Sequence, residues 1–250
     1  MNNISFIMYS HSSYSDLWEA FFGRMKKHLK TEFESYYLFT DEVPEERKAI
    51  VPSNFKVVQY DNDDSYTNRL IDCFSSIKTD FCLFQHEDMI LYDDVNEDVL
   101  EEYLNIAKTE KIDFVKLIKG GLPHDTAIDF SHPTCDSLKL SFDTFQYIIA
   151  IQAAIWKKNT FLEILHSHKN KNIWEFEAQA QEYCRQKNYK CYYSFVGTEK
   201  KRGKYHWDSL IYPYIATAVY KGKWTTDQYL AELEDLSQEY DIDLQKRGVC

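Results

Sequence analysis

FCLFQHEDMIL, residues 81–91, joins an apolar run directly to three polar side chains, His86, Glu87 and Asp88. The apolar run lacks helical spacing, so it predicts a strand that is buried on both faces of a sheet. Polar groups at the end of such a strand lie where open α/β sheets bind their ligands. Two adjacent carboxylates beside an imidazole are costly to bury unless they hold a cation, take up a proton or stay hydrated. The stretch therefore predicts either a metal and diphosphate site or a hydrated acidic turn after a core strand.

Strand and helix patterns alternate through the first half of the chain. Strands are expected at residues 4–9, 36–40, 55–60, 81–85 and 114–118, and helices at residues 17–29, 65–77 and 97–108. Ser65 is expected to cap the second of these helices. Short connections between alternating strands and helices are typical of a mostly parallel sheet with helices on both faces. The fold class predicted from this pattern is α/β with a Rossmann-like central sheet.

The alternation becomes irregular after Gly121. Residues 119–137 combine glycine, proline, histidine and aspartate, and we interpret them as a long functional loop. The remaining expected elements are strands at 147–151 and 189–196, helices at 159–165, 172–187, 210–220 and from Thr226 onward, and a basic loop at 200–204. No repeat, low-complexity tract or linker divides the chain, so a single domain with a mixed second half is expected.

Composition and missing motifs argue against several function classes. The 250 residues include 29 basic and 40 acidic side chains, for a net charge of −11. A uniformly acidic surface repels nucleic acid and anionic lipid, and a phosphorylated ligand would need a local basic cluster or a metal ion. The G-x-G-x-x-G, P-loop lysine and G-x-S-x-G motifs are absent from the sequence. This argues against dinucleotide oxidoreduction, P-loop phosphoryl transfer and serine hydrolysis.

The cysteines and the apolar segments bear on location. Six cysteines show neither a C-x-x-C pair nor zinc-ligand spacing, and Cys73 and Cys82 fall in segments that suit reduced, buried thiols. No segment approaches the ~18 apolar residues that a membrane span needs. We therefore expect a soluble, cytoplasmic protein without a transmembrane segment.

An α/β first half, the triplet His86-Glu87-Asp88 at the end of a central strand and a mixed second half together resemble the GT-A glycosyltransferases. Enzymes of that family move a sugar from a nucleotide diphosphate donor to an acceptor. Their hallmark is an Asp-x-Asp motif at a strand end that holds a divalent metal against the donor diphosphate. Here a histidine stands at its first position, and in some members the motif is reduced to Glu-Asp. The resemblance implies a nucleotide-binding half at residues 1–118 and an acceptor-binding half at residues 119–250.

The acidic triplet and a downstream histidine are the candidate metal ligands. A hard cation such as Mg²⁺ or Mn²⁺ takes carboxylate oxygens and neutralises a leaving diphosphate. Asp88 is the first candidate ligand, and Glu87 is a second ligand or a group that orients the acceptor. The resemblance implies a further ligand from a histidine near the end of the catalytic domain, a position that His206 matches.

Donor-binding residues are expected at strand ends and in the basic loop. The resemblance implies contacts to the base and ribose from the ends of the first and third strands, which carry Tyr9, Ser10, His11 and Asp61. Arg69 would reach the diphosphate or the base, and Lys201 and Arg202 would compensate phosphate charge. The alternatives are that Ser10 only starts a turn, that Arg69 only pairs with Asp72, and that residues 200–204 form a solvated loop beside a half-buried His206.

WEFE, residues 174–177, opens a helix and offers two carboxylates for acid–base chemistry. An inverting transferase needs a carboxylate that deprotonates the acceptor hydroxyl, and apolar neighbours raise a glutamate pKa toward a useful range. Glu175 and Glu177 lie roughly 200° apart on a helix, so only one of them points into a site. The resemblance favours Glu177 as the base. Alternatively, both carboxylates only complement the helix dipole.

These residues predict an inverting, metal-assisted glycosyltransferase of polysaccharide biosynthesis that transfers a hexose or pentose. Its partners would be a nucleotide-sugar donor and a glycan or lipid-linked acceptor. Trp156, Trp174 and Trp207 are candidate stacking platforms for sugar rings, or ordinary core residues. One alternative is a sugar nucleotidyltransferase, although that class normally carries a glycine-rich loop that residues 9–13 lack. The other is a non-catalytic glycan-binding module on the same fold.

Overall fold

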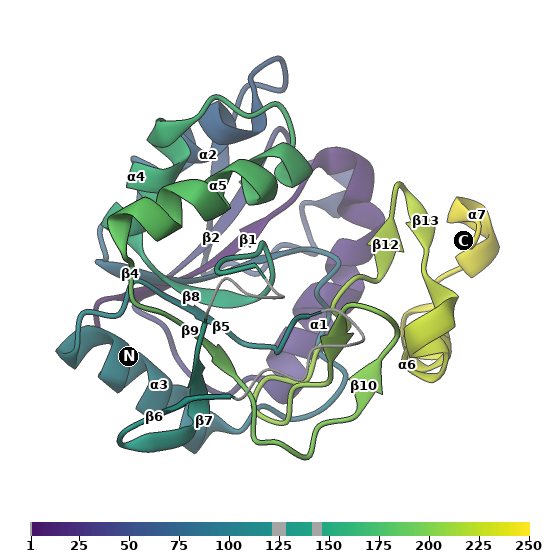
Figure 1. Ribbon diagram of the computed structural model, residues 1–250. Coiled ribbons are helices and arrows are strands. Elements are labelled where there is room, and N and C mark those ends of the chain that lie inside the picture. Colours follow the sequence, from purple (N-terminus) through teal and green to yellow (C-terminus); the bar gives the residue numbers. More distant parts are fainter. Residues whose placement is uncertain (1, 122–128, 142–146) are drawn as a thin grey trace.

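A nine-stranded mixed sheet forms the centre of the described part of the chain (Figure 1). The computed structural model describes residues 2–121, 129–141 and 147–250. The strands lie in the order β3-β2-β1-β4-β8-β5-β9-β7-β6. Their bounds are β1 (Ile4–Tyr9), β2 (Ser35–Thr40), β3 (Phe55–Gln59), β4 (Phe81–His86), β5 (Phe114–Lys116), β6 (Ser131–His132), β7 (Cys135–Leu140), β8 (Ala154–Lys157) and β9 (Cys191–Ser194). This architecture confirms the predicted α/β fold class with a large central sheet flanked by helices.

The direction of the strands divides the sheet in two. β3, β2, β1 and β4 are all parallel to their neighbours within this group. Beyond β4, β8 runs antiparallel to both β4 and β5, whereas β9 is parallel to β5 and antiparallel to β7. The predicted parallel sheet therefore describes the first half of the chain, and the second half adds mostly antiparallel pairings.

The helices confirm most of the predicted periodic segments. They are α1 (Trp18–His28), α2 (Tyr66–Phe74), α3 (Glu97–Thr109), α4 (Lys158–Ser167), α5 (Ile173–Lys187), α6 (Thr226–Tyr240) and α7 (Leu244–Arg247), with two 3₁₀ helices, η1 (Ser12–Leu17) and η2 (Glu45–Arg47). Ser65 caps α2 as predicted, because its side chain accepts a hydrogen bond from the Asn68 backbone N–H at 3.3 Å. Within the described ranges, every helix is too short or too polar to cross a membrane.

Side chains of the central strands pack into two cores, one on each face of the sheet. Successive side chains of a strand point to opposite faces, so Ile4, Phe6 and Met8 of β1 enter one core and Ile7 and Tyr9 enter the other. Helices α1 and α3 contribute to the first core, and α2, α4 and α5 contribute to the second. β4 follows the same alternation, which explains why its sequence is apolar without interruption.

Residues 210–220 do not form the predicted helix. They run extended beside residues 88–96, with hydrogen bonds from the Ile215 N–H to the Ile90 carbonyl (2.9 Å) and from the Tyr92 N–H to the Pro213 carbonyl (3.1 Å). The segment ends in β12 (Val219–Tyr220), which pairs with β13 (Lys223–Trp224). Pro213 lacks a backbone donor and disfavours helical backbone in the residue before it. The helix prediction was wrong because residues 211–216 are all buried, so this stretch has no amphipathic spacing to read.

Three other predicted segments also differ from the structure. Residues 147–151 lie outside regular structure, and the strand near them is β8. In the expected loop at 119–137, residues 131–137 hold β6 and the start of β7, whereas residues 122–128 lie outside the described residues. The basic loop at 200–204 contains β10 (Lys201–Arg202), which pairs with β11 (His206–Trp207). The second and third differences arise from strand pairing with partners that the local pattern does not specify.

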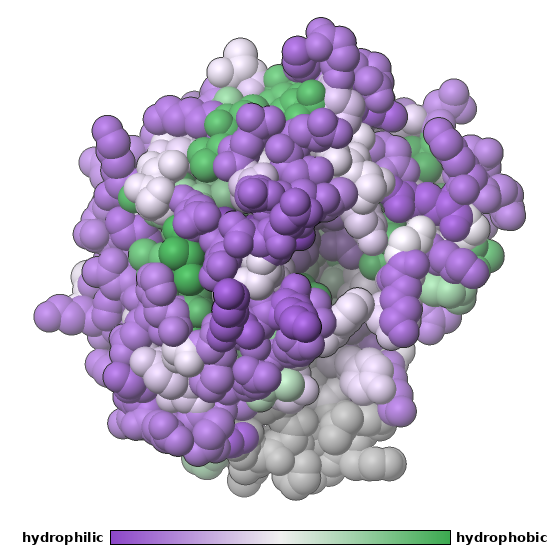
Figure 2. All heavy atoms as spheres, turned by 90° about the horizontal axis from the view of Figure 1, so that it is seen from above, coloured by the Kyte–Doolittle hydropathy of each residue, from purple (hydrophilic) through white to green (hydrophobic). Residues whose placement is uncertain are grey.

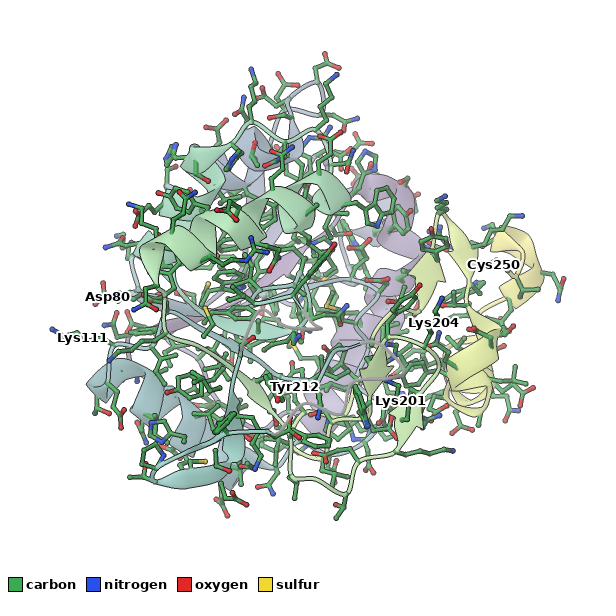
Figure 3. All side chains as sticks on the ribbon, in the orientation of Figure 1. Asp80, Lys111, Lys201, Lys204, Tyr212 and Cys250 are labelled. Carbon is green, nitrogen blue, oxygen red and sulfur yellow. The ribbon has the colours of Figure 1, made fainter. Side chains whose placement is uncertain are left out.

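A buried hydrogen bond ties β4 to the extended segment at 210–220. Gln85, 1% exposed, is a polar residue inside β4 and immediately precedes the acidic triplet. Its Oε1 accepts a hydrogen bond from the hydroxyl of Tyr212 at 2.9 Å (Figure 3 labels Tyr212). This bond fastens the C-terminal part of the chain to the strand that carries the acidic residues.

Removing one partner of this pair should destabilise the fold. Tyr212→Phe leaves the Gln85 amide buried without its partner, so we expect the free energy of unfolding to fall by about 1–3 kcal/mol. Urea denaturation of the variant against the wild type measures the change. Tyr220→Phe, at an exposed ring, is the control and should have no effect. Equal stability of the two variants would contradict the expectation.

Candidate functional site

A cleft of about 1310 Å³ opens at the carboxyl ends of β1 and β4. Tyr9 ends β1, His86 ends β4, and both residues line the cleft. The strand order reverses at this point, because β2 and β3 lie on one side of β1 and β4 lies on the other. Such a switch point is where open α/β sheets bind ligands. Figure 2 shows a hollow among the side chains near the middle of one face.

The cleft brings together most of the residues that the sequence singled out. Seven of the eleven predicted site residues line it: Tyr9, His11, Arg69, Glu87, Asp88, Glu177 and His206. They come from β1, the N-cap of η1, α2, the turn after β4, α5 and β11, so the fold gathers them from both halves of the chain. The four that do not belong to its described lining are Ser10, Asp61, Lys201 and Arg202.

Ser10 and Asp61 form hydrogen bonds close to the strand ends, outside the described lining of the cleft. Ser10 is fully buried, and its Oγ accepts a hydrogen bond from the Trp18 indole N–H at 2.8 Å. Asp61 is exposed, and its Oδ1 accepts a hydrogen bond from the Asp63 N–H at 2.9 Å. Both side chains therefore act locally, outside the cleft lining.

Lys201 and Arg202 are held by the β10–β11 hairpin (Figure 3 labels Lys201). The ammonium of Lys201 lies 3.4 Å from the centre of the Trp207 ring. Arg202 donates hydrogen bonds to Asp208, at 2.8 Å, and to Glu232. The Arg202 charge is thus already balanced by two carboxylates, because the hairpin turns it toward α6 rather than toward the cleft.

Glu87 and Asp88 form a buried pair of carboxylates in the turn after β4. Burial and the neighbouring Asp88 charge raise the pKa of Glu87 well above its usual range. Burial also raises the pKa of Asp88, against the effect of the Val219 N–H, which donates to Asp88 Oδ2 at 3.4 Å. The pair therefore fits a ligand that brings positive charge to this turn.

Asp88 and His206 line one cleft, but the described residues do not close a protein cage around a metal there. Within the described ranges, the group of three candidate ligands that approach one another is His28, Asp93 and Asp94, away from the cleft lining. His206 Nε2 is buried and has no hydrogen-bond partner in the described part of the chain, and burial lowers its pKa to about 4, so its imidazole is neutral. Mg²⁺ commonly binds one or two carboxylates plus substrate phosphates. The donor set fits an ion of that kind.

Glu177 lies one turn into α5 and lines the cleft. Its Oε1 accepts a hydrogen bond from the Ile151 N–H at 2.6 Å. Burial raises its pKa to about 7, although that hydrogen bond and the charge of Lys116 oppose the shift. Glu175 instead accepts a hydrogen bond from the Lys171 N–H at 2.9 Å beside the start of α5. The two carboxylates are thus separated, and burial brings the pKa of Glu177 close to neutral pH.

Tyr9 and Arg69 line the cleft beside β1, and both contact the ring of Tyr60, which lies outside the described lining. Tyr9 stacks on Tyr60, with ring centroids 5.4 Å apart and planes inclined by 12°. The Arg69 guanidinium carbon lies 5.2 Å from the centre of the Tyr60 ring. Its Nε donates a hydrogen bond to the Asp64 carbonyl at 3.0 Å. Arg69 is therefore oriented by the backbone before α2, with its cation against an aromatic face.

Comparisons with known proteins bear on the fold. No protein-family model matches the chain, and no curated protein sequence matches it. S. aureus TarS 1-349 is 13% identical, with a TM-score of 0.50 over 98% of this chain and 68% of that one. The bifunctional IspDF from Campylobacter jejuni is 13% identical, with a TM-score of 0.46 over 84% of this chain, which spans 52% of that protein. A CMP:2-keto-3-deoxy-manno-octonic acid synthetase complexed with CTP is 10% identical, with a TM-score of 0.46 over 78% of this chain and 89% of that one.

The chain has a GT-A-like fold. At 13% identity the likeness to S. aureus TarS 1-349 concerns the fold alone, and it agrees with the predicted Rossmann-like central sheet flanked by helices. The predicted fold family is therefore confirmed. The roles of the individual cleft residues stay predictions, and they are taken up below.

One buried lysine of the cleft was missed by sequence reasoning. Lys116 ends β5 and is 2% exposed, and burial lowers its pKa to about 8 while the charge of Glu177 opposes that shift. A lone lysine inside the apolar run FVKLI, residues 114–118, is the signal that was available. An ammonium is rarely buried in a core strand without a partner or a ligand.

The charge of the cleft differs from that of the whole chain. Its described lining contains four basic and four acidic side chains: Arg69, Lys116, Lys171, Lys221, Glu87, Asp88, Glu177 and Asp227. The chain as a whole carries a net charge of −11. The cleft is therefore a place where an anionic ligand meets little of the repulsion expected elsewhere on the surface.

Glu177→Gln should stabilise the protein at high pH. A carboxyl whose pKa rises from its usual 4.5 to about 7 on folding loses stability as the pH rises between those values. Glutamine removes this loss and keeps an oxygen that accepts the Ile151 N–H bond. We expect the variant to exceed the wild type by about 1–3 kcal/mol in free energy of unfolding at pH 8 and to match it at pH 4.

Urea unfolding at both pH values measures the gain. Glu175→Gln, two residues earlier on the same helix, is the matched control and should show no pH-dependent gain. A Glu177→Gln gain that is equal at pH 4 and pH 8 would show that the buried charge is not its cause.

Proposed function

We propose that this chain is a nucleotide-sugar-dependent glycosyltransferase that transfers a hexose or pentose with inversion. The observation that carries the proposal is the meeting, in one cleft, of the buried pair Glu87 and Asp88 with a separate buried carboxylate, Glu177. The pair suits a cation and a diphosphate, and the separate carboxylate suits proton transfer. The GT-A-like fold supports the proposal, since the cleft lies at the switch point of the sheet.

The donor nucleotide would bind against the wall formed by Tyr9 and Arg69. Aromatic faces and a guanidinium suit the stacking of a nucleobase, and the Arg69 cation suits a diphosphate. His11 adds a polar edge beside β1, where its Nε2 lies 3.1 Å from Asn62 Oδ1. Lys116 adds a buried ammonium to the same cleft. These groups would compensate phosphate charge, while Lys201 and Arg202 would act only at longer range.

A divalent metal, Mg²⁺ or Mn²⁺, would be held by Asp88, with Glu87 or the neutral imidazole of His206 as a further ligand. When bound, it would neutralise charge on the diphosphate leaving group. The bound cation would also stabilise the charged forms of Glu87 and Asp88, and so lower the pKa values that burial raises.

Glu177 would act as the base. Its carboxylate would take the proton of the acceptor hydroxyl while that oxygen bonds to the anomeric carbon. The bond from this carbon to the diphosphate oxygen breaks at the same time, and its electron pair leaves with the diphosphate. The Ile151 N–H holds the carboxylate in place at 2.6 Å. A pKa of about 7 suits a base that works near neutral pH.

A reducing compartment such as the cytoplasm is the location that we infer for this enzyme. All six cysteines are free thiols, and five of them are buried. Structural disulfides are rare where glutathione and thioredoxin keep thiols reduced. The free thiols agree with such a location. Nucleotide-sugar donors would be used there for the assembly of polysaccharides.

A sugar nucleotidyltransferase is the second candidate, because the GT-A-like fold is common to both classes. The products separate the two functions. A glycosyltransferase releases a nucleoside diphosphate from a nucleotide-sugar, whereas a nucleotidyltransferase releases pyrophosphate from a nucleoside triphosphate and a sugar phosphate. Pyrophosphate release with no nucleoside diphosphate would favour the second candidate.

Nucleotide binding should depend on Asp88 and on a divalent metal. We expect calorimetry to show Mn²⁺-dependent binding of UDP or GDP, and Asp88→Asn to weaken it by about 10–100-fold through loss of a metal ligand. Asp72→Asn, at an exposed position of α2, is the matched control. If neither UDP nor GDP binds, whether Mn²⁺ is present or absent, the proposal is contradicted.

Turnover should depend on Glu177 and on pH. We expect Glu177→Gln to lower kcat by about 10²–10⁴-fold and to leave UDP binding unchanged. In the wild type, kcat should fall about tenfold per pH unit below pH 7, because the base becomes protonated there. Glu175→Gln should retain wild-type turnover. Activity of Glu177→Gln within about tenfold of wild type would place the base elsewhere.

A further inference from the structure

Exposed aromatic side chains gather at the mouth of the cleft. The described residues include ten large hydrophobic side chains that are exposed, and four of them line the cleft. All four are aromatic: Tyr147 (48% exposed), Trp174 (55%), Tyr205 (57%) and Tyr220 (45%). The exposed aliphatic side chains all lie elsewhere: Val57, Val196, Leu210, Leu230 and Val249. We call the four aromatic side chains the aromatic rim.

Three of the rim residues sit on ordered backbone rather than on free loops. Trp174 lies in the first turn of α5, whose N-cap is Asn172. Tyr205 occupies the turn of the β10–β11 hairpin, and its carbonyl accepts a hydrogen bond from the Gly121 N–H at 2.9 Å. Tyr220 ends β12 before a tight turn with positive φ at residues 221 and 222. Figure 1 shows α5 across one face of the sheet and the β12–β13 hairpin next to α6 and α7. The rings are therefore presented by fixed elements, which limits the entropy lost on binding.

Besides its charged side chains, the cleft offers neutral hydrogen-bonding groups. Asn172, Thr217, Thr225 and Gln228 line the same cleft. A sugar ring has an apolar C–H face that stacks on an aromatic ring and an equator of hydroxyls that bond to amides and hydroxyls. A lipid chain would instead call for aliphatic side chains, which the rim lacks among its exposed residues. The net charge of −11 also opposes an anionic membrane surface.

The size of the cleft leaves room for more than the donor. Its volume of about 1310 Å³ exceeds the roughly 300–1,000 Å³ of most small-molecule sites. Tyr9 and Arg69 occupy the wall beside β1, whereas the rim comes from α5, the two hairpins and the segment before β8. The two sets of groups thus belong to different elements of one cleft.

We propose that the aromatic rim is an acceptor subsite for an oligosaccharide, in which Trp174 and Tyr205 stack on sugar rings. The proposal rests on the transferase function proposed above, and it names a glycan of several rings, rather than a lipid or a protein, as the acceptor. Binding at the rim does not need the nucleotide, so it is measured separately from donor binding.

Trp174 provides a built-in reporter. Of the five tryptophans, all within the described residues, Trp18, Trp156 and Trp224 are at most 1% exposed, Trp207 is half-buried, and Trp174 is 55% exposed. Acrylamide quenching of tryptophan fluorescence therefore reports mainly on Trp174. An array of neutral and anionic oligosaccharides of two to six rings selects the probe, which is then titrated against the full chain without nucleotide.

We expect a selected oligosaccharide to protect Trp174 from quenching, and its longest form to bind at least tenfold more tightly than its disaccharide. Trp174→Ala and Tyr205→Ala, followed by calorimetry, should each weaken binding at least tenfold. Phe130→Ala, at an exposed aromatic outside the cleft lining, is the matched control and should bind as the wild type does. Circular dichroism establishes that each variant is folded.

The outcomes separate this inference from the proposed function. UDP binding with no oligosaccharide binding, or oligosaccharide binding that survives both rim substitutions, would overturn the rim inference and leave the transferase standing. Rim-dependent oligosaccharide binding with no nucleotide binding would overturn the transferase and support the rim as a glycan site. Binding of both ligands, with rim substitutions affecting the oligosaccharide but not UDP, would support both.

Discussion

The acidic turn after β4 depends on the antiparallel contact between residues 88–96 and residues 211–218. The Ala218 N–H donates to the Asp88 carbonyl at 3.3 Å, and the Ile215 N–H donates to the Ile90 carbonyl at 2.9 Å. These bonds satisfy the backbone that leaves the sheet, so the turn can be buried. Burial in turn raises the pKa values of Glu87 and Asp88. The site is therefore a product of both halves of the chain, because the C-terminal segment provides the low-polarity surroundings.

The cations of the β10–β11 hairpin, Lys201 and Arg202, interact with other side chains of the C-terminal part of the chain. Arg202 is paired with Asp208 and Glu232, and Lys201 lies over the Trp207 ring. The most basic stretch of the sequence thus stabilises the hairpin beside the cleft. The positive charge inside the cleft comes instead from scattered residues such as Arg69 and Lys116. A run of like charges in a sequence marks a solvated or paired surface more often than a binding site, and here three-dimensional position separates the two.

The first half of the chain was predictable because its local patterns match its tertiary surroundings. The apolar run of β4 reflects burial on both faces, and Ser65 caps α2 through a bond to its own first turn. Parallel strand ends meet at one sheet edge, so Tyr9 and Asp88 were expected together and do line one cleft. The helical angle between Glu175 and Glu177 likewise separates them as expected. The second half was less predictable because residues 211–216, around Pro213, are all buried, so neither helical nor strand periodicity is visible there.

By itself, the sequence determined the α/β class and the acidic turn after a buried strand, since both rest on local apolar patterns and on strand ends that share an edge. The helical spacing of Glu175 and Glu177 predicted only that one of them would point into a site, and the resemblance to GT-A glycosyltransferases favoured Glu177. Only the tertiary structure decided that Lys116 and Glu177 line one cleft and influence each other's charge. It also decided that Arg202 pairs with Asp208 and Glu232, and that four exposed aromatic side chains line the same cleft. These contacts join residues far apart in the chain. They follow from strand order and cross-sheet hydrogen bonds, which periodicity and composition do not encode.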